Sequence, residues 1–136
     1  MTDALKRQCK FILKILKINM FNPITIPKLT QAIGRYDQFL QSMWAPTKPQ
    51  NLIMVPTLDI DLIWHSHQLN PVGYYQFCTT KSPSRQLVSH DDNLGDEVLN
   101  SSGSSTQQYW DSRYGANDYI HKRAFYEPVN NRQYQQ

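Results

Sequence analysis

Apolar residues recur every three or four positions near the start of the chain, and this spacing predicts an amphipathic helix over residues 3–18. Its apolar stripe consists of Leu5, Cys9, Ile12, Leu13 and Leu16. Lysines and an arginine occupy the other sectors, and Asn22-Pro23 ends the helix. We favour docking of one helix face onto the rest of the domain, with contact to an anionic membrane or another subunit as the alternatives.

The second predicted helix has the clearest pattern in the chain. It begins near Pro27, which suits a first helical turn. Its predicted core-facing stripe contains Leu29, Ile33, Tyr36, Leu40 and Met43. Residues 45–51 are predicted to be a connection because they contain two prolines, and a weak strand signal follows at 52–55.

Two further helices are predicted to meet at a corner. The first covers about residues 57–69, with Thr57 as N-cap and acidic residues in the first turn. The second runs from Pro71 to about Cys78, with Asn70 as its N-cap.

The pattern weakens beyond Thr79 into polar and turn-forming residues. The stretch Ser-Ser-Gly-Ser-Ser at 101–105 is the most linker-like part of the chain, and we expect it to be mobile. A last helix is predicted over about residues 106–114, stopping at Gly115. The pattern as a whole indicates an all-α fold, a compact single-domain bundle of about five helices with a loop-rich C-terminal third.

Composition agrees with one globular domain. The 136 residues are 40% hydrophobic and 18% charged, with a formal net charge of +3, so neither a disordered chain nor a dedicated nucleic-acid-binding protein is indicated. Expected boundaries are a basic helix at 1–22, the helical domain at 23–126 and a flexible tail at 127–136.

Lysines interrupt the apolar stretch at 11–20, which excludes a transmembrane segment there. The two cysteines lie far apart, so we expect reduced thiols and a cytoplasmic location.

Candidate chemistry gathers at one helix and the segment that follows it. Three of the four histidines lie in Trp64-His-Ser-His67 and in His90-Asp91-Asp92. Imidazole and carboxylate are common ligands of divalent metals, so the pattern suggests one ion, zinc above all. The candidate metal ligands are Asp61, His65, His67, His90 and Asp91.

Helix geometry restricts this metal hypothesis. His65 and His67 are about 200° apart on a helix and cannot both bind one ion there. Asp61 and His65 lie one turn apart on the same side, so the favoured set is Asp61, His65 and His90 with Asp91 or Asp92. The alternative is that the histidines are buried and hydrogen-bonded in an apolar helix. In either case Asp59 is expected on a solvated face.

Two other functional classes have weaker signals. A histidine, a His-Asp doublet and a later aspartate resemble the pattern of metal-dependent phosphohydrolases, with His65 or His67, His90-Asp91 and Asp118 as candidates. For nucleic acid, the basic residues of the first helix lack interleaved aromatic residues, so no strong signal is present. The preferred function is a non-catalytic interaction module with a protein partner, and the alternative is a hydrolase of phosphoesters.

The segment Val55-Pro-Thr-Leu-Asp-Ile-Asp-Leu-Ile-Trp-His-Ser-His-Gln-Leu-Asn-Pro71 closely resembles the glycine-rich-domain-containing-protein-like family, a domain of unknown function in fungi and plants. The fungal branch is the nearer match, over about residues 24–119. The resemblance implies a Tyr-rich helix, a His-Asp-Asp triplet and a closing helix with Trp110 and Tyr114-Gly115. Plant members often lack the triplet and append glycine-rich segments, whereas this chain has five glycines.

Overall fold

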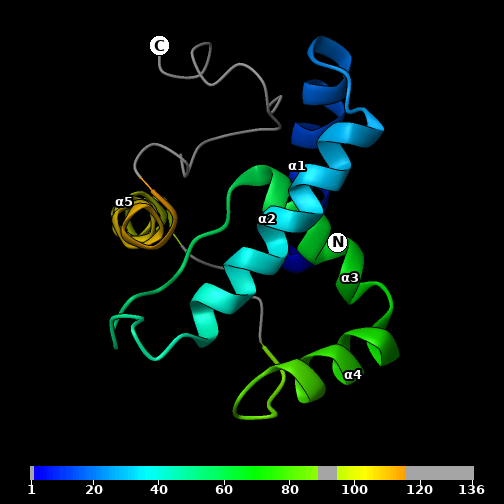
Figure 1. Cartoon of the computed structure of the whole chain (residues 1–136). Helices are drawn as coiled ribbons and strands as arrows, with labels where there is room; N and C mark the ends of the chain where they lie inside the picture. The colour runs from blue at the N-terminus through cyan, green and yellow to red at the C-terminus, as the bar shows by residue number, and fades with distance from the viewer. Residues whose placement is uncertain (1, 89–94, 116–136) are drawn as a thin grey trace.

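The computed structural model describes residues 2–88 and 95–115 and confirms an all-α fold (Figure 1). No strand occurs within these two ranges. The helices, in chain order, are α1 (Asp3–Phe21), α2 (Ile26–Trp44), α3 (Leu58–Gln68), α4 (Pro71–Lys81) and α5 (Asp96–Tyr114).

Two helix starts match the predictions, with Pro27 in the first turn of α2 and Asn70 as the N-cap of α4. Thr25 caps α2, and its hydroxyl accepts a hydrogen bond from the Lys28 amide at 3.4 Å. Asn70 caps α4, and its side-chain oxygen accepts from the Gly73 amide at 3.1 Å. Proline occupies the first turn of both helices, where a missing amide hydrogen costs nothing.

The hydrophobic core forms where α2, α3, α4 and α5 meet, and its members come from all four helices and from the 52–55 segment. They are Tyr36, Phe39, Leu40, Met54, Ile60, Trp64, Tyr74, Cys78, Tyr109 and Trp110. Figure 1 shows α5 end-on beside α2, with α4 at the far end of α3. Because two aromatic residues of α5 are core members, this last helix is an integral part of the fold.

The buried face of α2 is rotated from the predicted stripe. Tyr36 and Leu40 are buried as expected, but Ile33 is 54% exposed. Ala32, Arg35 and Phe39 are buried instead. The prediction failed at Ile33 because it counted hydrophobic residues alone. The Arg35 side of the helix is buried instead, because Arg35 forms a buried ion pair with Asp59 of α3.

The serine-rich stretch at 101–105 is not a linker but lies within α5. Ser104 and Ser105 each donate to the backbone carbonyl four residues earlier, at 3.2 Å, so the helix itself satisfies their hydroxyl groups. Gly103 and Thr106 are buried on the inner side. The Thr106 hydroxyl accepts a hydrogen bond from the Val55 amide at 3.0 Å. Val55, which lies in the weak strand signal at 52–55, therefore bonds to a helix side chain rather than to a neighbouring strand.

Helix α1 docks through a face that the sequence analysis did not select. None of its residues is fully buried, and its half-buried apolar residues are Phe11, Ile15 and Ile18. The predicted stripe, which includes Ile12 and Leu16, points to solvent. No helix in the described part of the chain has the length and apolar character needed to cross a membrane.

Candidate functional site

Asp61 and His65 form the pair that helical spacing predicts. The Asp61 carboxylate lies 3.4 Å from the His65 Nε2 atom, and both side chains are largely buried. The His65 ring also stacks on Phe11 of α1, with 4.2 Å between ring centroids. This pair therefore lies under the first helix, between α1 and α3.

His67 faces a different environment on the other side of α3. Its Nδ1 atom is 2.8 Å from the Tyr36 hydroxyl, and its ring meets three aromatic rings edge-on, those of Tyr36, Tyr74 and Phe77. His65 and His67 thus have separate partners, in keeping with their expected separation around the helix.

The rest of the predicted metal set cannot be placed. His90, Asp91 and Asp92 lie outside the described residues, as does Asp118 of the hydrolase pattern. Within residues 2–88 and 95–115, no three His, Cys, Asp or Glu side chains gather as a metal site would require. Asp61 and His65 are brought together, and the metal site as a whole stays a prediction.

Hydrogen-bonded aromatic side chains lie next to His67. Trp64 donates its indole N–H to the Tyr74 hydroxyl at 3.0 Å, and Tyr74 donates to the Val88 carbonyl at 2.5 Å. Burial raises the pKa of Tyr74 to about 12 and also raises the pKa of Tyr36. Both phenols therefore remain neutral and act as hydrogen-bond donors or acceptors at physiological pH.

Burial of His67 makes stability depend on pH. Desolvation lowers the pKa of this imidazole from 6.5, so the folded state resists its protonation more than the unfolded state does. The resulting stabilisation is present above pH 6.5 and is lost as pH falls through the lower folded-state pKa. Urea unfolding across this range should show wild type losing stability with acidification more steeply than His67→Gln. Equal slopes in the two proteins would contradict this assignment.

Asp59 forms a buried ion pair that the sequence analysis missed. Its side chain is 2% exposed rather than solvated, and it lies 2.9 Å from Arg35 Nε. The Thr57 hydroxyl donates to Asp59 and accepts from Arg35 at 3.3 Å. The Arg35 guanidinium also sits 5.6 Å from the Trp110 ring centroid. These side chains therefore join α2, α3 and α5, and their role is structural.

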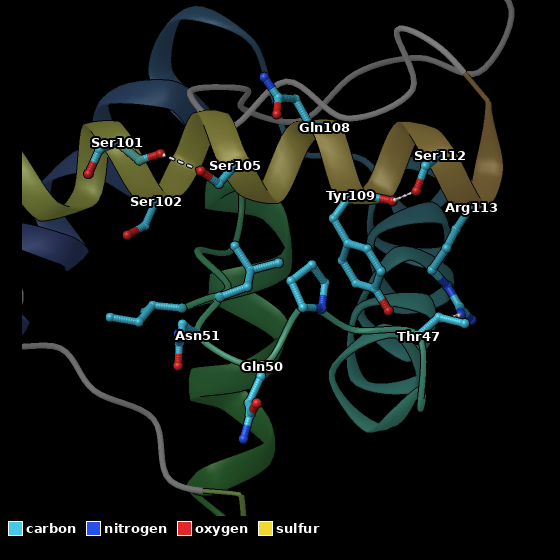
Figure 2. A pocket seen from close by; sticks show the side chains of 13 residues that line it. Thr47, Gln50, Asn51, Ser101, Ser102, Ser105, Gln108, Tyr109, Ser112 and Arg113 are labelled. Atoms are coloured by element: carbon cyan, nitrogen blue, oxygen red, sulfur yellow. Dashed lines mark hydrogen bonds between the residues drawn. The ribbon is translucent and has the colours of Figure 1, made fainter.

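A shallow groove between the 47–53 connection and α5 is the second feature that the sequence analysis missed. It encloses about 1020 Å³. Its walls are Thr47, Pro49–Ile53, Ser101, Ser102, Ser105, Gln108, Tyr109, Ser112 and Arg113. Figure 2 shows Ser102 and Tyr109 projecting from α5 toward the connection, with Arg113 reaching Thr47 at 3.5 Å. Both walls have the composition of loops, so their clustering of polar residues was the available signal.

A family model described as "Glycine-rich domain-containing protein-like" matches residues 1–76, more than half of the chain. The chain belongs to this family. The matched region contains α1, α2 and α3 and the first part of α4. It therefore carries the Asp61–His65 pair, both members of the Arg35–Asp59 ion pair and the connection wall of the groove.

Two plant proteins that are named glycine-rich domain-containing proteins are similar to this chain. The chain is similar to Glycine-rich domain-containing protein 2 of Arabidopsis thaliana, with 32% identity over 117 residues that cover 82% of the chain and 14% of the relative. Glycine-rich domain-containing protein 1 of the same plant is 29% identical over 144 aligned positions, covering 98% of the chain and 17% of the relative. The chain thus spans less than a fifth of either relative. The fungal branch stays a prediction, and no solved structure matches the chain.

The structure gives a physical role to the Trp-His-x-His segment of this glycine-rich domain-containing protein-like chain. Trp64 is 3% exposed and belongs to the core, whereas His65 contacts α1 and His67 contacts α2 and α4. The segment therefore connects α3 to three other helices.

Proposed function

We propose that this domain is a non-catalytic interaction module that binds a protein partner in the groove between the 47–53 connection and α5. The observation that carries the proposal is the chemistry of the walls, which offer hydroxyl, amide and apolar groups and one guanidinium. No carboxylate, imidazole, thiol or amine lines the described groove. Such walls suit recognition, because general acid–base chemistry most often uses groups of those missing types and the Tyr109 phenol already donates to the Ser42 carbonyl.

The groove fits an extended polypeptide segment better than a compact apolar ligand. Gln50 and Asn51 side chains can both donate and accept hydrogen bonds, as peptide N–H and C=O groups require. Ile53 is 47% exposed and offers a contact for an apolar side chain. Arg113 at one end supplies positive charge for an acidic residue or a terminal carboxylate.

Groove-filling substitution tests this function. Linear peptides enriched from a displayed random library on the wild-type protein should bind Ser105→Trp at least about tenfold more weakly, measured by fluorescence anisotropy. Ser104→Trp is the matched control, because Ser104 is also an exposed α5 serine bonded to its own helix but does not line the groove. Equal binding to both variants, or no enriched peptide, would rule out the groove.

The proposed location is the cytoplasm. Cys9 is exposed and Cys78 is buried, and neither forms a disulfide, which supports a reducing compartment. A single divalent ion, with zinc preferred, remains part of the proposal because Asp61 and His65 present two ligand types within 3.4 Å of each other. Elemental analysis of untagged wild type and His65→Ala tests for it. No contact among the described residues favours the phosphoester hydrolase, so the interaction module is the function proposed.

A further inference from the structure

Helix α1 carries an exposed apolar face along its whole length of about 28 Å. Five large apolar side chains on this face are about half exposed or more: Leu5, Ile12, Leu13, Leu16 and Met20. With 100° between successive residues, they cover a sector about 100° wide, roughly opposite the docked residues Phe11, Ile15 and Ile18. The face is therefore continuous and points away from the domain.

Positive charge lies beside this apolar face. Four exposed lysines follow one border of the sector: Lys6, Lys10, Lys14 and Lys17. Asp3 is the single acidic residue of the helix, and it already pairs with Lys6 at 3.3 Å. An apolar stripe bordered by lysines is typical of helices that lie in the interface of an anionic membrane, where the lysine stems reach up to the lipid phosphates.

The rest of the domain holds α1 in a suitable orientation. The stacking of Phe11 on His65 fixes the middle of the helix. At its C-terminal end, the Lys28 ammonium donates to Asn22 and to the Pro23 carbonyl, at 2.7 and 3.0 Å. The exposed face is thus presented by a preformed helix, which lowers the ordering cost of binding.

We propose that this face of α1 binds the surface of an anionic lipid bilayer, with the apolar stripe inserted among the acyl chains and the lysines at the phosphates. A second copy of the chain is a poorer occupant, because its α1 would bring more positive charge and one carboxylate that is already paired. The inference is independent of the groove, which lies between α5 and the 47–53 connection.

Vesicle co-sedimentation tests the proposal with the full chain. Wild type should bind vesicles of phosphatidylcholine with phosphatidylserine, and bind pure phosphatidylcholine vesicles far less. Leu13→Glu and the double variant Lys10→Glu/Lys17→Glu should each lower the partition coefficient at least about tenfold. All three positions are exposed, so circular dichroism should show an unchanged fold.

Two controls separate this surface from others. Leu69→Glu changes a leucine that is 83% exposed outside α1 and should bind vesicles like wild type. Ser105→Trp should also keep vesicle binding, so failure of the groove and failure of α1 can be told apart. Absent binding, equal binding to neutral vesicles, or equal loss in Leu69→Glu would overturn the proposal. A dimer that Leu13→Glu dissociates, without vesicle binding, would assign the face to a second copy.

Discussion

Asp59→Ala should lower the free energy of unfolding by about 3–5 kcal/mol, measured by urea denaturation. The substitution leaves the Arg35 guanidinium, which is 4% exposed at its side chain, without the carboxylate at 2.9 Å. It also removes the acceptor of the Thr57 hydroxyl. A buried cation that loses its counter-charge retains its desolvation cost, which is why the expected effect is large.

A double replacement distinguishes the ion pair from simple loss of packing. Arg35→Met with Asp59→Leu removes both charges and fills similar space, so it should recover most of the stability lost in Asp59→Ala. As an exposed control, Asp37→Ala should change stability by no more than about 0.5 kcal/mol. A cost below about 1 kcal/mol for Asp59→Ala would mean that this carboxylate is not buried against Arg35.

Trp110→Ala should cost about 3–5 kcal/mol in the same assay, because it empties the largest fully buried side-chain position in the described core. Trp110 also provides the ring that faces Arg35, so its loss removes a contact of the ion pair. The result would show that α5, which lies beyond the family-matched residues, stabilises the helices within them.

Two comparisons sharpen this prediction. Trp110→Phe retains an aromatic ring and should cost clearly less than Trp110→Ala. Tyr75→Ala removes an aromatic side chain that is 59% exposed on α4 and should change stability by at most about 0.5 kcal/mol. If Trp110→Ala unfolds with the wild-type midpoint, α5 does not complete the core.

Features with local causes could be predicted from the sequence. The N-cap at Asn70 and the prolines in the first helical turns depend on residues within one turn of the helix. The Asp61–His65 pair depends only on a spacing of four residues. Tyr36 and Leu40 were correctly placed in the core for the same reason.

Features that depend on distant partners could not be predicted. Asp59 is buried by an arginine 24 positions away, and no local pattern distinguishes it from a solvated first-turn acid. The stretch at 101–105 resembles a linker because its residues are small and polar. In the fold, small residues allow the close approach in which Thr106 meets the Val55 amide. The groove between these segments was missed because each wall alone has a loop-like composition.

The absence of any fully buried residue in α1 has a consequence for cooperativity. The Arg35–Asp59 ion pair joins α2 and α3, and the aromatic core also includes α4 and α5, so these four helices should open together in a single global event. Helix α1 contributes little to that unit, and its amides can exchange with solvent through local fraying at low energetic cost. The domain therefore combines a stable four-helix core with a folded first helix that opens separately from it and that a binding surface can stabilise.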